Sequence, residues 1–316
     1  MDRVEQPPAS TTAPGPPRVA VVIPCHNEDA TVGKVVADFR AALPDAAVVV
    51  VDNACTDRTA DRARAAGARV VTESRKGKGF ALLAGFQATR GADFVVMVDG
   101  DDTYPAERAR DLLAAARGGA DMVVGTRRAD AGHGAFRPFH ALGNRLFARL
   151  VRLIFGLRTR DLFSGYRVLS RRFIESSPLI ATGFEIEAEL SLQAVMHRFN
   201  VAEVPVAYRA RPAGSASKLA TYHDGSRVLI AILTTFRDYR PLTFFGSLSL
   251  FLLALSLAGG TVVVVGFVRT GLVPRLPLAV LSAALFILSA LSLACGVLLS
   301  SINRRAAELA TLINRR

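Results

Sequence analysis

Cysteine is scarce in this 316-residue chain, and its three cysteines lie far apart in the sequence. Cys25, Cys55 and Cys295 show neither the close pairing of a zinc site nor the framework of a disulfide-rich secreted domain. A secretory leader is also missing, because residues 1–17 hold five prolines and no apolar stretch. We therefore expect a disordered leader at 1–17 and no export of the main domain.

Charge is absent from two long stretches. Residues 241–268 and 276–303 are runs of 28 residues, each without Asp, Glu, Lys or Arg, and roughly 20 apolar residues suffice to cross a bilayer. Because a connector of only seven residues joins them, they predict a hairpin of two transmembrane helices at about 242–268 and 276–302. Two buried core helices are the less favoured alternative.

The arginines beside these runs predict their orientation. Two arginines precede the first run and four follow the second, against two in the connector. Since basic residues favour the cytoplasmic side, we expect an integral protein of the cell membrane with both termini and the large domain in the cytoplasm. Residues 221–240 are expected to form an amphipathic helix along the interface, and residues 304–316 a cytoplasmic tail.

Short apolar runs alternate with helical stretches between residues 19 and 127. This alternation predicts an α/β domain over 18–220, with a mostly parallel sheet and helices on both of its faces. In such sheets ligands bind beyond the carboxyl ends of the strands. The predicted strands are 19–23, 47–52, 69–72, 94–99 and 122–127, and the predicted helices lie near 29–42, 57–66, 77–90 and 106–117.

Two glycine-rich nucleotide motifs are missing from the predicted loops. The first loop reads PCHNE at 24–28, where a dinucleotide-binding fold needs G-x-G-x-x-G, and no G-x-x-x-x-G-K-[ST] motif is present. These absences exclude the common dinucleotide and P-loop sites. The segment RKGKG at 75–79 could still cradle a phosphate through Lys76 or Lys78, or it could be a solvated basic turn.

Three carboxylates follow the fourth predicted strand, in the segment DGDDTYP. Asp99, Asp101 and Asp102 would repel one another unless a cation or hydrogen-bond donors compensated their charge. Mg²⁺ or Mn²⁺, bound by one or two carboxylates and by the diphosphate oxygens of a nucleotide, fits these ligands. The alternative is an acidic helix start with Asp102 or Thr103 as its cap.

Positive charge is concentrated between residues 127 and 172. This stretch has 11 Arg, no Lys and two Asp, a net +9 of the chain's +12. Within it, residues 142–154 place leucines on one helical face and arginines on another, which predicts a helix at an anionic membrane surface. A core helix with a solvated basic face is the alternative. Nucleic acid is not an expected partner, since the sequence has no RNA-binding motif.

Seven motifs along the chain carry a family resemblance. They are VVIPCHNE (21–28), VVVDNACTDRT (49–59), GKGFALLAGF (77–86), VDGDDTYP (98–105), DLFSGYRVLSRR (161–172), TGFEIEAEL (182–190) and EVPVAYRARPAGSASKL (203–219). The first four resemble the family 2 glycosyltransferases of GT-A fold. The later ones, with the two apolar runs, look like the dolichol-phosphate mannose synthases and bacterial polyprenyl-phosphate glycosyltransferases. The resemblance covers about residues 18–302.

This resemblance implies a site for a nucleotide sugar and a metal. Asp99 and Asp101 would be the D-x-D pair, with Asp101 on the Mg²⁺ or Mn²⁺ ion and Asp99 on the metal or on the ribose. Many mannose synthases have a Gln where this chain has Thr103, which leaves the third protein ligand and the nucleotide open. The implied donor-binding residues are Pro24, Glu28, Asp52, Lys78, Asp99 and Asp101.

The resemblance also implies a site for a lipid phosphate. Glu187 lies where relatives with hydroxyl acceptors keep a base, but a phosphate acceptor is already largely dianionic at pH 7 and has less need of one. Glu187 is then expected to orient a substrate, or to belong to a solvated helix start with Glu185 and Glu189. The implied phosphate-binding residues are Arg127, Arg145, Arg211 and Lys218, and the implied catalytic residues are Asp101, Arg127, Glu187 and Arg211.

The main functional hypothesis is the inverting transfer of one sugar from a nucleotide diphosphate sugar, preferably UDP-glucose, to polyprenyl or dolichyl phosphate at the cytoplasmic membrane face. A GDP-mannose-dependent synthase and a non-catalytic nucleotide-sugar-binding scaffold are the alternatives. A processive polysaccharide synthase is disfavoured, because Gln193 does not begin a Q-x-x-R-W segment and two helices make no pore. Homo-oligomers could form through small residues of the spans, Gly246, Gly259, Gly260 and Gly266.

Overall fold

The computed structural model describes residues 18–128, 152, 161–183, 185–209, 230, 233–234 and 236–313. The chain divides into two compact units, Met1–Val228 and Leu229–Arg316, and each is described by itself. The leader predicted at 1–17 lies outside the described residues. So does the amphipathic helix predicted at 142–154, apart from Arg152, which is helical.

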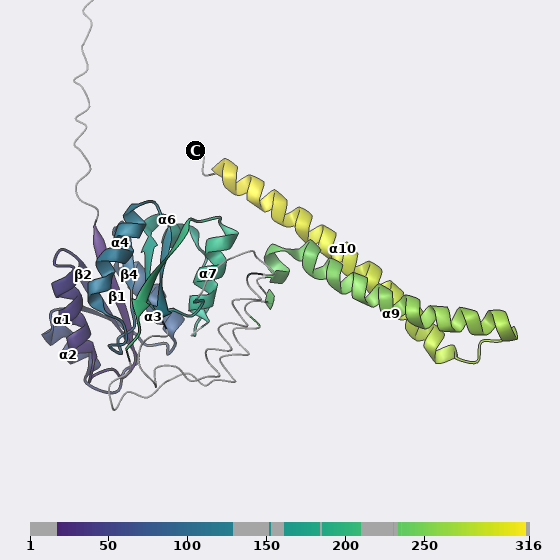
Figure 1. The fold of residues 1–316 in the computed structure, drawn as a ribbon, viewed down its shortest axis with the longest axis horizontal. Coiled ribbons are helices and arrows are strands. Elements are labelled where there is room, and N and C mark those ends of the chain that lie inside the picture. The colour runs from purple at the N-terminus through teal and green to yellow at the C-terminus, as the bar shows by residue number, and fades with distance from the viewer. Residues whose placement is uncertain are drawn as a thin grey trace, which may run out of the picture. The chain divides into compact units, whose positions relative to one another are not determined.

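A seven-stranded sheet is the centre of the first unit (Figure 1). Its strand order is β3-β2-β1-β4-β6-β5-β7, and β6 alone among these strands runs antiparallel to its neighbours, β4 and β5. The mostly parallel sheet confirms the predicted fold class. The strands are β1 (Val19–Cys25), β2 (Ala47–Asn53), β3 (Arg69–Glu73), β4 (Phe94–Met97), β5 (Met122–Arg128), β6 (Arg167–Ser170) and β7 (Val201–Ala207).

Helices cover both faces of this sheet because its central strands are apolar on both sides. In β1, Val21 and Ile23 belong to one buried cluster, and Val22 between them belongs to the other. The first cluster is covered by α1 (Val32–Ala42), α2 (Thr59–Ala65), the short 3₁₀ helix η1 (Ala106–Arg108) and α4 (Ala109–Arg117). The second is covered by α3 (Lys78–Ala88), α6 (Arg171–Ser176) and α7 (Ile186–Met196).

Four of these elements were not among the predicted ones: β6, β7, α6 and α7. The prediction was also wrong at the end of the fourth strand, because β4 ends at Met97 and not at residue 99. Asp99 therefore lies in the loop beyond the strand. The helical start after Pro105 makes no side-chain cap, so the proposed capping role of Asp102 or Thr103 is wrong as well.

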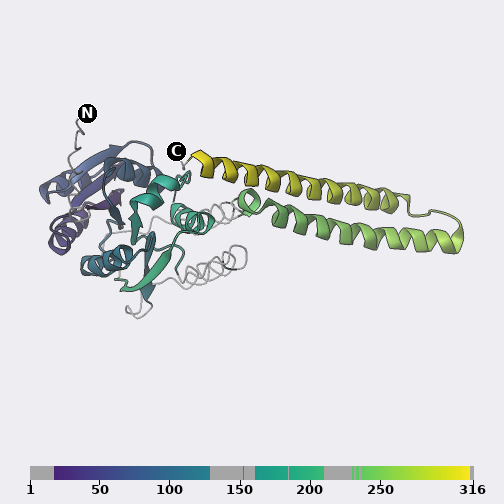
Figure 2. The ribbon, with the colours of Figure 1, turned by 90° about the horizontal axis from the view of Figure 1, so that it is seen from above.

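Two long apolar helices dominate the second unit, α9 (Pro241–Thr270) and α10 (Leu276–Ile313). They lie side by side as an antiparallel hairpin (Figure 2). Both are long and apolar enough to cross a membrane, and only 11% of each apolar window is buried. In length and composition they match the two predicted spans.

Serine side chains hold the two helices together. Ser249 Oγ lies 3.0 Å from Ser289 Oγ, and Ser256 donates to the Ser282 carbonyl at 2.8 Å. A Cβ on Gly259 would collide with Ser282, so Gly259 faces the neighbouring helix and is not available for association with another chain. At the other small residues predicted to associate, Gly246, Gly260 and Gly266, an added Cβ would meet no described atom within 4 Å.

Candidate functional site

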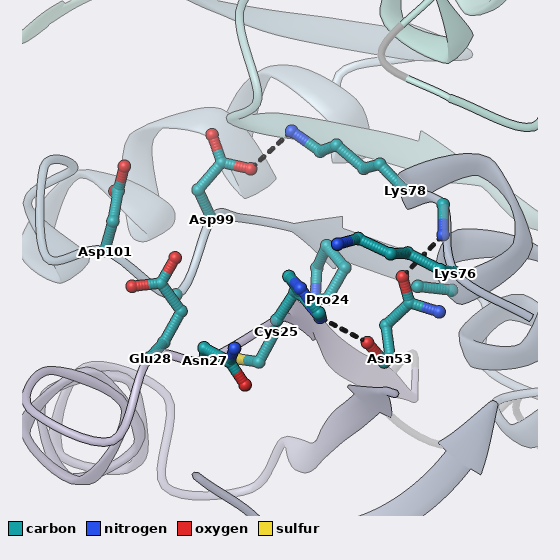
Figure 3. Close-up of a pocket in the computed structure, with 13 residues that line it drawn as sticks. Pro24, Cys25, Asn27, Glu28, Asn53, Lys76, Lys78, Asp99 and Asp101 are labelled. Atoms are coloured by element: carbon teal, nitrogen blue, oxygen red, sulfur yellow. Dashed lines mark hydrogen bonds and ion pairs between the residues drawn. The ribbon is translucent and has the colours of Figure 1, made fainter. Parts of the chain in front are cut away.

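A pocket of about 430 Å³ opens at the carboxyl ends of β1, β2 and β4. Parallel strands end at a common edge, which is where ligands bind in sheets of this kind. Acidic side chains lie along one side of the pocket and lysines lie across from them (Figure 3). The acidic residues are Glu28, Asp99 and Asp101, and the lysines are Lys76 and Lys78.

Lys78 makes two short charge contacts at the pocket. Its Nζ donates to Asp99 Oδ1 at 2.5 Å and to Glu187 Oε1 at 2.5 Å. Burial acts to lower the pKa of Lys78, but the two carboxylates outweigh burial, so the pKa is raised and Lys78 stays charged. The alternative of a solvated basic turn is therefore wrong for Lys78, whereas Lys76 is exposed.

Glu187 lies on the first turn of α7, in contact with Lys78, and does not line the pocket. It is only 4% exposed, and Glu189 is 8% exposed, so the alternative of a solvated helix start is wrong for both. Burial raises the pKa of Glu187, and Lys78 opposes that shift. Its second carboxylate oxygen, Oε2, makes no hydrogen bond within the described part of the chain.

Asp101 is held in place by Thr103, two residues further along the chain. Thr103 Oγ1 donates to Asp101 Oδ1 at 2.6 Å, and the Thr103 amide donates to the same oxygen at 3.3 Å. Asp101 is 3% exposed. Its neighbour Asp102 has a positive φ of 58° and turns away to pair with Lys34 at 2.8 Å. Of the three clustered carboxylates, Asp99 and Asp101 therefore face the pocket.

Asn53 is a pocket residue that the sequence analysis missed. Its Oδ1 accepts the Gly77 amide at 2.8 Å and its Nδ2 donates to the Arg75 carbonyl at 2.7 Å, so it fixes the basic turn against β2. The neighbouring Asp52 does not line the pocket, and its Oδ1 accepts the Cys55 amide at 3.0 Å. The available signal was the position of Asn53 at the end of an apolar strand.

The basic turn is also closely packed on the loop before α7. Gly79 donates its amide to the Thr182 carbonyl at 3.0 Å. A Cβ on Gly77 would collide with that carbonyl, and a Cβ on Gly79 would collide with the Ala181 carbonyl. Gly77 also has φ 152°, in the region that favours glycine. Both glycines are therefore required for the loop to approach the turn.

A second charged pair lies near the carboxyl end of β5. Arg127 binds Asp161 in a bidentate arrangement, from Nε to Oδ2 at 2.6 Å and from Nη2 to Oδ1 at 2.7 Å. Its guanidinium lies over the Tyr208 ring, 5.4 Å from the centroid. Asp161 was not predicted, although it begins one of the motifs. Arg127 does not line the pocket.

The structure thus brings together most of the predicted donor-binding residues. Pro24, Glu28, Lys78, Asp99 and Asp101 line one pocket, while Asp52 and Glu187 lie outside its lining. The predicted phosphate-binding residues Arg145, Arg211 and Lys218 lie outside the described residues.

Comparison with known proteins identifies the family. Residues 20–177 match the model of the glycosyl transferase family 2, so the chain belongs to that family, and its sheet is of the GT-A type. A relative from Haloferax volcanii named dolichyl-phosphate hexose transferase is 34% identical over 66% of this chain and 90% of its own length. A polyprenol monophosphomannose synthase from Mycolicibacterium smegmatis is 30% identical over 62% of this chain and 79% of its own.

A solved structure resembles the fold of this chain over more than two thirds of its length. Glucosyl-3-phosphoglycerate synthase from Mycobacterium tuberculosis, crystallised with Mn²⁺, UDP-glucose and phosphoglyceric acid, aligns with a TM-score of 0.58. The alignment covers 70% of this chain and 80% of that one, at 27% identity.

Proposed function

We propose that this protein transfers a single hexose from a nucleotide diphosphate sugar to a polyprenyl or dolichyl phosphate at a membrane. The observation that carries the proposal is the pocket in which Asp99 and Asp101 face Lys76 and Lys78, in a chain that also has two helices able to span a bilayer. The names of the two relatives support the lipid phosphate as acceptor.

The donor side of the pocket fits a nucleotide diphosphate and a hard divalent cation. Asp99 and Asp101 offer the carboxylate oxygens that Mg²⁺ and Mn²⁺ prefer. No group of three or more His, Cys, Asp or Glu side chains that could hold a metal is present in the described part of the chain. Because Mg²⁺ is usually bound by one or two carboxylates together with substrate phosphates, phosphate oxygens of the donor would supply further ligands. Such a cation would neutralise charge on the departing diphosphate.

The residues of the chain supply positioning and charge. Lys76 and Lys78 place positive charge at the pocket, with the Lys78 ammonium in contact with Asp99, where it can stabilise the diphosphate as it leaves. Arg127 carries a guanidinium suited to a phosphate dianion, and we assign the acceptor phosphate to it. The acceptor oxygen would attack the anomeric carbon in line, with inversion, and needs no base because it is already ionised at neutral pH.

The test is a transfer assay with the full-length protein in lipid. Protein, Mn²⁺ or Mg²⁺, labelled UDP-glucose and undecaprenyl phosphate should give a lipid-soluble labelled product. Asp101→Ala and Arg127→Ala should each abolish it, whereas Asp102→Asn, which changes a neighbouring carboxylate outside the pocket and tolerates a positive φ, should retain it. Full turnover by Asp101→Ala would refute the mechanism, and nucleotide binding without any lipid-dependent transfer would favour a scaffold.

UDP-glucose is the preferred donor, supported by the bound UDP-glucose of the structural neighbour. The mannose synthase relative favours GDP-mannose as the second candidate. Running the same assay with both nucleotide sugars decides between them, since the preferred donor should show the higher kcat/KM.

A further inference from the structure

We propose that Glu187 is a positioning residue that holds the ammonium group of Lys78 at the diphosphate end of the donor pocket, and that it does not act as a base on the acceptor. This inference rests on the proposed function in so far as the pocket takes a nucleotide diphosphate. It assigns Glu187 a role exercised through Lys78.

The first ground is access. Lys78 and Asp99 line the pocket, whereas Glu187 does not. Glu187 lies on α7 among buried apolar residues of the second core cluster, with Ile186 and Leu190 fully buried beside it. The Lys78 ammonium bonds to Glu187 Oε1, so this carboxylate oxygen is already occupied by a side chain that does line the pocket. A base must reach the proton it removes, and this carboxylate is buried, paired with Lys78 and absent from the pocket lining.

The second ground is the number of charges. One ammonium bridges two carboxylates, Asp99 and Glu187, at 2.5 Å each. If Asp99 turns to a metal ion when the donor binds, the N–H group of Lys78 that now forms a hydrogen bond with Asp99 can form one with a phosphate oxygen instead. Lys78 then depends on Glu187 to keep its place, since a long lysine side chain has many other rotamers.

The third ground is the rigidity of the support. Ser191 Oγ donates to the Glu187 carbonyl at 3.1 Å and accepts from Arg167 Nη1 at 2.9 Å. Arg167 is fully buried and also donates to the Leu162 and Ser164 carbonyls. The turn of α7 that carries Glu187 is therefore fixed to β6, which adjoins the strand leading to Asp99. The carboxylate that anchors Lys78 thus stands on a fixed element.

The test measures nucleotide binding without any acceptor, a quantity that loss of a base would leave unchanged. Full-length protein is titrated with Mn²⁺-UDP and with Mn²⁺-GDP by calorimetry, and the tighter ligand is used throughout. Glu187→Gln should weaken its affinity about tenfold, as expected for the loss of a charge-assisted contact. Glu175→Gln, which removes one exposed carboxylate from α6, is the charge-matched control and should bind as the wild type does.

A double-mutant cycle separates positioning from a general structural effect. In a Lys78→Met background, Glu187→Gln should change the affinity less than about twofold, because its partner is already gone. The proposal would be overturned if the effects of Lys78→Met and Glu187→Gln on nucleotide affinity were independent and multiplied in the double variant. It would also be overturned by a Glu187→Gln variant that binds the nucleotide normally but has lost turnover. Should Glu187→Gln fail to fold, Glu187→Asp takes its place in both backgrounds. An affinity loss confined to the background with Lys78 supports the proposal, and wild-type affinity overturns it.

Failure of this inference is distinguishable from failure of the proposed function. If no lipid phosphate is glycosylated but the coupling between Lys78 and Glu187 appears in nucleotide affinity, the inference stands without the function. If transfer occurs and the affinity is insensitive to Glu187, the function stands without the inference. If neither nucleotide binds, both are wrong.

Discussion

At the scale of single residues, buried ion pairs fix the positions of charged side chains at the candidate site. Arg127 and Asp161 are an example, because both side chains are largely buried and their two short hydrogen bonds fix the guanidinium plane. Removing one member of such a pair leaves the other charged and unpaired. If Arg127 binds the acceptor phosphate as we propose, Asp161 controls how the guanidinium is presented to it.

We expect Asp161→Asn to raise KM for the lipid phosphate by about tenfold while leaving KM for the nucleotide sugar within about twofold. Steady-state kinetics with each substrate varied in turn check this. Glu107→Gln, which breaks the exposed pair with Arg209, serves as the control. Equal effects on both substrates would mean that Asp161 supports the whole site and not Arg127 in particular.

The reactivity of the Cys55 thiol is predicted to depend on pH. Burial and the neighbouring Asp52 raise the pKa of its thiol from 9.0 to about 11. Because the thiolate is the reactive form, its population at pH 8 is on the order of 100-fold below that of an unperturbed thiol. Alkylation of Cys55, followed by mass spectrometry, should accelerate about tenfold per pH unit up to about pH 11. A plateau near pH 9 would contradict the raised pKa.

The sequence predicted part of the site, and distance along the chain explains the rest. Asp99 and Asp101 could be predicted because they follow an apolar strand directly, where the sheet edge places ligands. The contact between Lys78 and Glu187 joins residues 109 positions apart, and no local pattern encodes it. The burial of Glu187 was missed for a different reason: glutamate is mostly exposed in proteins, so a helix start rich in Glu suggests a solvated surface.

At the scale of elements, the predicted strands were the ones with continuous apolar runs. β6 lies beyond the alternating segment at 19–127 from which the strands were predicted, and β7 was missed because Glu203 and Pro205 interrupt its pattern. β7 lies at the edge of the sheet, where a proline is tolerated because one side of the strand donates no ladder hydrogen bonds. Both strands depend on tertiary pairing more than on their own residues.

The hairpin of α9 and α10 yields a prediction about its serines. Replacing Ser249 and Ser289 by Ala removes their mutual hydrogen bond and should cost on the order of 1 kcal/mol of helix–helix stability in a bilayer. A steric-trapping measurement of hairpin dissociation tests this. Ser247→Ala is the matched control, because Ser247 bonds only to its own helix, at Phe244. A similar loss of helix–helix stability in the Ser247→Ala control would show that the Ser249–Ser289 hydrogen bond does not specifically stabilise the hairpin.

At the scale of the whole molecule, the two units divide the work that we propose. The sheet unit has its own two cores and its own pocket, while the hairpin exposes apolar side chains over most of its length. An exposed apolar surface of this extent is not stable in water. The hairpin is thus the part that would bring the sheet unit to a lipid substrate.

The predicted orientation can be tested in intact cells. Leu272 lies exposed between the two spans, and Arg305 is exposed beyond the second. If both termini are cytoplasmic, a membrane-impermeant maleimide should label Leu272→Cys from outside and should leave Arg305→Cys at the background of the wild type. The reverse pattern would show the opposite orientation.

The loop before β6 approaches Asp99 closely at Gly165, and this contact restricts how the sequence can vary. A Cβ on Gly165 would collide with the Asp99 carboxylate, which is the partner of Lys78. Any side chain at position 165 would displace that carboxylate before it disturbed either hydrophobic core. A substitution there would behave genetically as a weakened allele of Asp99, in a protein that still folds. Position 165 thus belongs with the candidate site, because the absence of a side chain there leaves room for the Asp99 carboxylate.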